Sequence, residues 1–275
     1  MIINGHTQQL WMLGHPVAQT VSPGLLNAAF AAANENFVLQ AIDVPPAQLA
    51  QAIQVLRHSA NVQGCLLTIP HKLLAVDHLD VLSDRSQALG LVNIIHKTPK
   101  GLEGDALDGQ GFLGALERHG LNLHGQSVLV IGCGGAGAAS AWDALNAGAG
   151  KVGIYDVSES RLAQMHQILA QRFGAQRVKI VSSLQQSDSD WQIILNASPV
   201  GMHEIDPLPV PIDCMPDGAV LVDAITPKHP SRWLTQAAAC GHRVIHGHDF
   251  TRGQVVAMAR FFGLSGRVVQ ALSEA

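Results

Sequence analysis

Residues 132–137 combine a glycine pattern with a position between an apolar run and an Ala-rich segment. They read GCGGAG, which fits G-x-G-x-x-G, and they lie between VLVI and AASAWDALNAG. We therefore expect a strand, a tight turn and a helix, in which Gly134 lets the backbone approach a pyrophosphate and Gly137 lets helix and strand pack closely. A glycine-rich turn without a ligand is the alternative. The pattern predicts cofactor contacts at Gly132, Gly134, Gly135, Ala136 and Gly137.

The next apolar run ends at Tyr155 and Asp156, about 20 residues beyond the glycine turn. A carboxylate at this point can accept hydrogen bonds from the adenosine ribose hydroxyls, and it would repel a 2′-phosphate. Arg161 is the nearest cation, five positions later. We therefore expect NAD as the cofactor rather than NADP. A turn that caps the next helix before Ser158 is the alternative role for Asp156.

Alternating strands and helices must position these residues. In the first hundred residues apolar runs predict strands at 10–14, 37–44 and 62–70, and helical spacing predicts helices at 23–36 and 45–59. Ser22 and Pro23 fit the cap and first turn of the first helix. This alternation predicts a parallel sheet covered on both faces. A second strand–helix series begins near residue 109, and a last helix is expected over roughly 251–272.

Composition excludes several classes of protein. The 275 residues carry 17 Lys and Arg against 21 Asp and Glu, a net charge of −4, which argues against a nucleic-acid or anionic-membrane surface. No apolar run reaches the length of about 18 residues that a membrane span needs, and the start lacks the pattern of a signal peptide. We expect a soluble cytoplasmic protein. The four cysteines form no C-x-x-C pair, and His246 and His248 read as polar loop residues, so no metal site is expected.

Six further segments carry polar residues in a characteristic order. They are GHPVAQTVSP at 14–23, TIPHK at 68–72, LVN at 91–93, GDALDG at 104–109, NASPVGM at 196–202, and Gly247 with Gln254. Together with the glycine turn they resemble the shikimate/quinate dehydrogenase family over nearly the whole chain. The resemblance implies an α/β substrate-binding and catalytic domain with a mostly parallel sheet at 1–108 and a Rossmann domain that binds NAD or NADP at 109–250. The C-terminal segment 251–275 could pack back on the first domain.

The resemblance also implies an acid–base pair. Oxidation of a ring alcohol removes a hydride, which the nicotinamide takes, and a proton, which a side chain must take. The family pattern assigns this task to Lys72 and Asp108. A lysine normally titrates near 10.4, so we expect partial burial to lower the pKa of Lys72, whereas a nearby carboxylate would raise it. Lys72 as sole proton acceptor and the two residues as one coupled unit are both open.

The same resemblance assigns the remaining contacts. Residues expected to bind the substrate are Thr20, Ser22, Thr68, Asn93, Gln254 and Thr226. Further residues expected to contact the cofactor are Arg161, Ser198, Met202 and Gly247. Thr226 stands where the family usually has a tyrosine, Leu66 replaces a family asparagine, and Ala106 and Leu107 replace Asn-Thr before Asp108. Because the predicted pair is kept while its surroundings differ, the pattern suggests a divergent member of the family.

Several functions fit this pattern. The leading hypothesis is reversible, NAD(P)-dependent hydride transfer between shikimate and 3-dehydroshikimate. Quinate, whose extra hydroxyl the smaller Thr226 could accommodate, and an amino analogue of shikimate are alternative substrates. Methylene-tetrahydrofolate dehydrogenase is a related enzyme whose motifs match less well, and a non-catalytic NAD-binding regulator is a hypothesis from another class. We expect a small-molecule substrate as the partner, no nucleic acid and no membrane, and a monomer or a homodimer.

Overall fold

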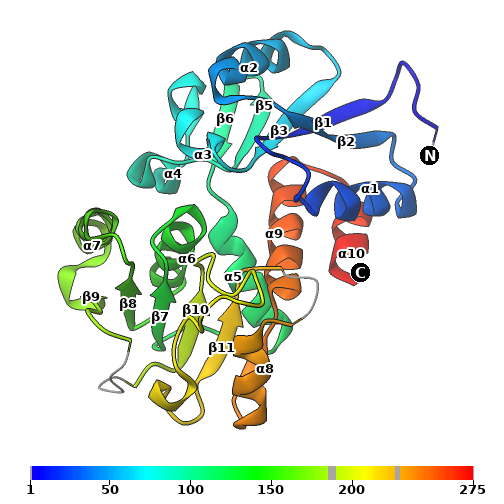
Figure 1. The fold of residues 1–275 in the computed structure, drawn as a ribbon. Helices are drawn as coiled ribbons and strands as arrows, with labels where there is room; N and C mark the ends of the chain where they lie inside the picture. The colour runs from blue at the N-terminus through cyan, green and yellow to red at the C-terminus, as the bar shows by residue number, and fades with distance from the viewer. Residues whose placement is uncertain (1, 185–189, 227–229, 275) are drawn as a thin grey trace. The chain divides into compact units, whose positions relative to one another are not determined.

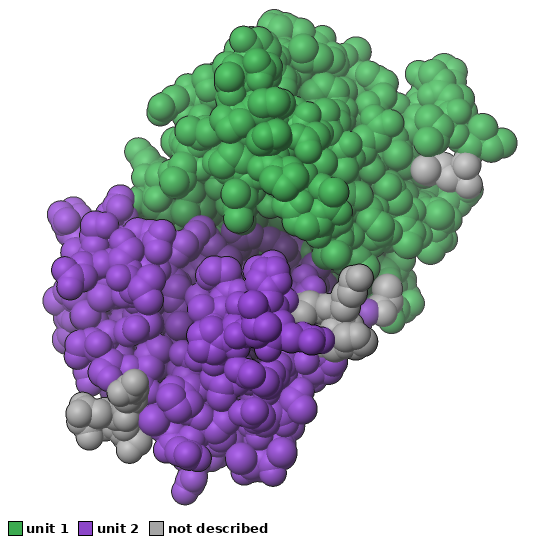
Figure 2. All heavy atoms as spheres, viewed as in Figure 1, with its two compact units in different colours: residues 1–107, 255–275 green, residues 108–254 purple. Residues whose placement is uncertain are grey.

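The chain folds into two compact units. The computed structural model describes residues 2–184, 190–226 and 230–274. Unit 1 comprises residues 1–107 and 255–275, and unit 2 comprises residues 108–254 (Figures 1 and 2). Among the described residues, each unit contains a six-stranded sheet.

The sheet of unit 1 has the strand order β2-β1-β3-β5-β6-β4. Its strands are β1 (Gln8–Gly14), β2 (Phe37–Asp43), β3 (Val62–Leu67), β4 (Val81–Leu82), β5 (Ile94–Thr98) and β6 (Gly101–Asp105). β1 runs parallel to β2 and β3, and β4 runs parallel to β6, whereas β5 is antiparallel to both β3 and β6. The predicted mostly parallel sheet is confirmed, but the hairpin of β5 and β6 departs from it. Only two residues join these strands, and so short a link permits only antiparallel pairing.

The helices of unit 1 follow the apolar spacing of the sequence. They are α1 (Ser22–Ala32), α2 (Leu49–His58), α3 (His71–Leu74) and α4 (Asp84–Leu89), with short 3-10 turns at Pro46–Gln48 and Val76–His78. The predicted capping role of Ser22 is wrong: Val21 is the N-cap, no side chain caps the helix, and Ser22 is a buried residue of its first turn.

The last part of the chain forms two helices. α9 (Gly247–Phe261) and α10 (Gly266–Glu274) replace the single helix expected over 251–272. The helix is interrupted at Gly263, between α9 and α10. Gly263 adopts the left-handed conformation with φ +64° that favours glycine. Apolar side chains of these helices, such as Met258 and Leu272, share one core cluster with Leu10 and Phe30 of β1 and α1. Burial of this apolar surface makes 255–275 part of unit 1.

Unit 2 is a doubly wound parallel sheet with the strand order β12-β11-β10-β7-β8-β9. Its strands are β7 (Ser127–Ile131), β8 (Lys151–Tyr155), β9 (Val178–Ile180), β10 (Ile193–Asn196), β11 (Val220–Asp223) and β12 (Arg243–Ile245), and every pairing is parallel. Its helices are α5 (Asp108–Arg118), α6 (Gly135–Asn146), α7 (Glu159–Phe173) and α8 (Arg232–Ala239), with 3-10 turns at Ala175–Arg177 and Ile212–Cys214. Numbered from β7, this order is that of a dinucleotide-binding Rossmann fold, as expected from the sequence.

The central strand of unit 2 and the helix that follows it are largely buried. Residues 128–131 of β7 are all buried, and so are residues 137–145 of α6. A parallel sheet covered by helices on both faces needs such continuous apolar strands. Within the described residues, none of the helices has the length and apolar character needed to cross a membrane.

Candidate functional site

The carboxyl ends of the strands of unit 2 gather the predicted cofactor residues. Segment 132–137 follows β7, Asp156 follows β8 and Ser198 follows β10, and the predicted substrate residue Thr226 follows β11 at the same edge. Parallel strands end at the same edge of their sheet, so residues far apart in the sequence meet there. In doubly wound folds this edge, next to the point where the strand order reverses, is where ligands bind.

The glycine turn is closely packed on one side and open on the other. Gly132 has φ +96°, and a Cβ on Gly137 would lie 1.8 Å from the carbonyl oxygen of Gly132, so neither position admits a side chain. Gly134 is the N-cap of α6, and no described atom lies within 4 Å of where its Cβ would be. Gly135 and Ala136 form the first turn of α6. The open side therefore exposes the positive end of a helix, which suits an anion.

A cavity of about 760 Å³ adjoins this turn within unit 2. Its lining includes residues of the glycine turn, the end of β8 and the loop after β10, among them Gly132, Gly134, Tyr155, Asp156, Arg161 and Ser198. Pro207, Leu208 and Pro209 contribute apolar surface to the same cavity. Its volume lies within the range of about 300–1,000 Å³ that is typical of small-molecule and cofactor sites.

Asp156 is a fixed carboxylate in the wall of this cavity. One oxygen accepts a hydrogen bond from the backbone N–H of Cys133 (2.7 Å), and the other accepts from the backbone N–H of Ser158 (2.8 Å) and from Nη2 of Arg161 (2.9 Å). Burial alone would raise the pKa of Asp156, but these hydrogen bonds and the guanidinium outweigh it and hold the pKa below its usual range. The side chain of Asp156 is 5% exposed and that of Arg161 is 56% exposed. The carboxylate is therefore ionised and oriented at neutral pH.

The other predicted cofactor residues lie around the loop after β10. The hydroxyl of Ser198 donates to Oδ1 of Asn196 (2.7 Å), which is a hydrogen bond within the loop. Met202 is exposed at the end of this loop. Gly247 begins α9, and a Cβ there would lie 1.8 Å from the carbonyl oxygen of Ile225. Gly247 is thus required for close packing against the segment that follows β11.

Predicted substrate residues of unit 1 also gather at one edge of a sheet. The backbone N–H of Thr68 donates to Leu13 O (3.0 Å) just after β3, and the N–H of Val92 donates to the carbonyl of Lys72 (2.8 Å). Lys72 is a half-buried residue of α3, and Asn93 directly precedes β5. These contacts bring the TIPHK segment beside the LVN segment.

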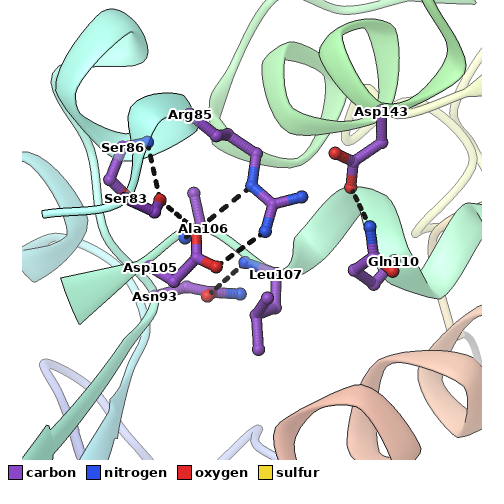
Figure 3. Close-up of polar contacts among 9 residues, drawn as sticks. All are labelled: Ser83, Arg85, Ser86, Asn93, Asp105, Ala106, Leu107, Gln110 and Asp143. Carbon is purple, nitrogen blue, oxygen red and sulfur yellow. Dashed lines mark hydrogen bonds and ion pairs between the residues drawn. The ribbon is translucent and has the colours of Figure 1, made fainter. Parts of the chain in front are cut away.

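Several predicted substrate residues already have hydrogen-bond partners in unit 1. The hydroxyl of Thr20 donates to Val17 O (2.8 Å). Asn93 is almost fully buried, and its Oδ1 accepts from the backbone N–H of Leu107 (2.8 Å), as Figure 3 shows. Asn93 therefore holds the chain just before Asp108 in place.

Asp108 is the first residue of α5, where a carboxylate suits the helix dipole, and it is buried. Nε2 of Gln254, on α9, donates to its Oδ1. This contact brings together two residues that the sequence assigned to catalysis and substrate binding. Lys72 belongs to unit 1 and Asp108 to unit 2.

Glycines allow α5 to approach its neighbours closely. A Cβ on Gly111 would lie 2.7 Å from the carbonyl oxygen of Phe250, and one on Gly114 would lie 2.7 Å from the Cα of Gly253. α5 and α9 can therefore lie backbone to backbone beside the contact between Asp108 and Gln254. On the α6 side, Nε2 of Gln110 donates to Asp143 (2.8 Å; Figure 3).

An ion pair fixes the segment of unit 1 that leads to Asp108. Nη2 of Arg85 donates to Oδ2 of Asp105 (2.8 Å), and Nε donates to Oδ1 (3.2 Å). The same Oδ1 accepts from the hydroxyl of Ser83 (2.5 Å) and the backbone N–H of Ala106 (2.7 Å). Figure 3 shows these groups converging on the Asp105 carboxylate at the end of β6. No local sequence pattern indicates this pair, because only the fold brings α4 beside β6.

Two of the residues that depart from the family pattern, Leu66 and Ala106, lie in the core. Leu66 is fully buried and shares an apolar core cluster with Leu107. Ala106 is fully buried as well. Both Leu66 and Leu107 stand where the family has a polar residue, and the two apolar side chains belong to the same core cluster. Thr226 is half-buried at the end of the segment after β11.

Comparisons with known proteins relate the chain to one family. Residues 12–95 match the family described as the shikimate dehydrogenase substrate binding domain. Shikimate dehydrogenase (NADP(+)) of Rubrobacter xylanophilus is 34% identical over 237 residues, which cover 86% of this chain and 83% of the relative. The chain belongs to the shikimate dehydrogenase family. The resemblance inferred from the motifs is thereby confirmed.

Solved structures of this family have the same fold. The shikimate dehydrogenase of Aquifex aeolicus superposes with a TM-score of 0.86 at 26% identity and covers 100% of both chains. Shikimate 5-dehydrogenase of Thermus thermophilus, solved with NADP(H) and shikimate, superposes with a TM-score of 0.82 at 29% identity and covers 98% of this chain and 99% of its own. The family and the Rossmann sheet together support a nicotinamide cofactor. No group of three or more His, Cys, Asp or Glu that could hold a metal ion occurs in the described part of the chain.

Proposed function

We propose that this protein is a dehydrogenase that interconverts shikimate and 3-dehydroshikimate with a nicotinamide cofactor. The observation that carries the proposal is the buried Asp108 at the start of α5, bound by Gln254, in a chain that also keeps Lys72 in its family motif. Unit 1 is assigned the substrate and unit 2 the cofactor. The names of the curated relatives support the same activity.

The chain's own residues take the proton and orient the substrate in this proposal. A bound nicotinamide would supply the hydride acceptor. Lys72 and Asp108 act as the acid–base pair that exchanges the proton of the ring hydroxyl. Gln254 orients the Asp108 carboxylate through its hydrogen bond. Thr20, Ser22, Thr68, Asn93 and Thr226 are the proposed substrate contacts.

We propose NAD as the preferred cofactor. Asp156 supports this choice because its ionised carboxylate lies in the wall of the cavity and would repel a 2′-phosphate. NADP is the second candidate, because the relatives carry NADP(+) in their names and the half-exposed Arg161 is a cation that a 2′-phosphate could bind. The glycine turn, Ser198, Met202 and Gly247 are the other proposed cofactor contacts.

A four-way comparison of rates tests the activity. kcat/KM is measured with shikimate and with quinate, each with NAD and with NADP. We expect the highest value with shikimate and NAD, and Lys72→Ala should lower kcat by a factor of at least 100 while the Kd for NADH changes little. Binding of NADH without turnover of either acid would refute the dehydrogenase and favour a cofactor-binding regulator. A higher kcat/KM with quinate than with shikimate would make quinate the preferred substrate, whose extra hydroxyl the small side chain of Thr226 would accommodate.

Asp156→Ala tests the choice of cofactor. Removing the carboxylate removes the repulsion of a 2′-phosphate and frees Arg161, so the NAD to NADP ratio of kcat/KM should fall at least tenfold. The variant also removes the acceptor of the Cys133 and Ser158 backbone N–H groups, so the Kd for NADH is measured alongside. An unchanged ratio would show that Asp156 does not contact the ribose.

A further inference from the structure

A single buried amide closes the loop after β10. Nδ2 of Asn196 donates to Val200 O (3.0 Å) and to Oδ1 of Asp223 (2.9 Å), and its Oδ1 accepts from both the N–H (3.2 Å) and the hydroxyl (2.7 Å) of Ser198. All donors and acceptors that this amide needs for a fixed orientation are engaged. The shape of residues 196–200 therefore depends on Asn196.

Asp223 fixes Asn196 in turn. It ends β11, lies opposite Asn196 in the parallel register of β10 and β11, and is 1% exposed. Besides Asn196, the hydroxyl of Ser231 (2.7 Å) and the backbone N–H of Ile225 donate to its carboxylate. Burial raises the pKa of Asp223 to about 6, against the opposing effect of these hydrogen bonds. A carboxylate buried among neutral donors is costly to keep ionised, which is more typical of functional than of purely structural positions.

The segment after Asp223 packs against both neighbouring parts of the site. A Cβ on Gly201, which has φ +96°, would lie 3.3 Å from Cδ1 of Ile225. The backbone of Gly247 lies against the carbonyl of Ile225 on the other side. Residues 223–226 are thus enclosed between the 196–202 loop and the start of α9, and they end at Thr226.

We propose that Asp223 is a positioning residue that holds the 196–202 loop and the 223–226 segment in one arrangement, so that cofactor contacts and the Thr226 contact are set together. This inference rests on the proposed function, which assigns Ser198 and Met202 to the cofactor and Thr226 to the substrate. Asp223 is 1% exposed, so we assign it no direct contact with either ligand. Its effect is transmitted through Asn196 and Ile225.

The test uses Asp223→Asn in the full chain. This variant removes the buried charge and keeps the size of the side chain, but its amide NH2 must face a hydrogen-bond donor. We expect the Kd for NADH and the KM for shikimate each to rise at least fivefold and kcat to fall about tenfold, since small misplacements at a reacting centre are costly. Hydrogen exchange in peptides covering 196–202 should become faster. Asp217→Asn, the same change at an exposed carboxylate of unit 2, should leave all four values within twofold.

Three results would overturn the proposal. They are NADH and shikimate constants within twofold of the wild type, a change in only one of the two, and a lower Tm with unchanged constants. If Asp223→Asn does not fold, Ser231→Ala removes one of the three hydrogen bonds and should shift both constants in the same direction by a smaller factor. The Kd for NADH and the exchange of 196–202 can be measured without turnover. Failure of the proposed activity, seen as no turnover by the wild type, is therefore distinguishable from failure of this inference.

Discussion

The ion pair of Arg85 and Asp105 makes a prediction that combines stability with activity. Replacing Arg85 by Ala removes both guanidinium hydrogen bonds from the Asp105 carboxylate. Both side chains are only 12% exposed, and breaking a buried pair on one side costs about 3–5 kcal/mol. Ser83 and the N–H of Ala106 continue to donate to Asp105, so we expect a loss of about 2–3 kcal/mol in the free energy of unfolding of unit 1. At about 2–4 °C for each kcal/mol, Tm should fall by about 5–10 °C.

The assay is a double-mutant cycle of Arg85→Ala and Asp105→Ala, followed by thermal and urea unfolding. Because the two groups contact each other, the double variant should lose about 1–3 kcal/mol less than the sum of the single variants. Arg57→Ala is the matched control, since Arg57 pairs with Asp80 at side-chain exposures of 27% and 40% and should contribute no more than about 1 kcal/mol. kcat for shikimate should fall in Arg85→Ala, because Asp105 fixes the backbone that leads to Asp108, while the Kd for NADH should stay unchanged.

Two outcomes would refute this reasoning. If Arg85→Ala is as mild as Arg57→Ala, the buried position of the pair does not determine its strength. If the cycle is additive, Arg85 and Asp105 act on stability independently. Arg85→Lys keeps the charge but not the two-point geometry, and it should recover only part of the loss.

Two further predictions concern unit 2. In the folded chain the pKa of Asp223 is about 6, whereas in the unfolded chain it is near 3.8, so the stability that Asp223 contributes falls as pH rises through this window. Relative to the wild type, Asp223→Asn should therefore gain about 2 kcal/mol in the free energy of unfolding between pH 4 and pH 7, measured by urea unfolding. A difference that stays constant with pH would contradict the raised pKa. Gly114→Ala places a Cβ 2.7 Å from the Cα of Gly253, so it should lower the free energy of unfolding by about 1–3 kcal/mol and lower kcat. The control is Gly24→Ala, whose Cβ would have no described atom within 4 Å and should stabilise α1 by about 0.5–1 kcal/mol. Equal Tm shifts for the two variants would contradict close packing of α5 on α9.

Much of this protein was predictable from local patterns. The glycine turn needs Gly132 and Gly137 for backbone reasons that hold wherever a strand meets a helix in this way, so the Rossmann unit could be inferred from a short segment. The order of the polar motifs indicated the family, which the comparisons confirmed. The roles of Lys72 and Asp108 stay predictions, because no ligand contact tests them.

Other features depend on contacts between distant residues. The β5–β6 hairpin and the break at Gly263 depend on short links that apolar periodicity does not reveal. The bond from Gln254 to Asp108 joins residues 146 positions apart, and it depends on how closely α5 and α9 pack. Local spacing cannot encode such distances.

The sequence by itself determined which chemical groups this protein has. They are the glycine turn at 132–137, the carboxylate of Asp156 after β8, and the family's Lys72 and Asp108. Only the tertiary structure decided which polar side chains fix one another, as Asp223 fixes Asn196 and Arg85 fixes Asp105. The physical reason is that burial turns a hydrogen bond between distant residues into a strong constraint, and burial is a property of the folded chain.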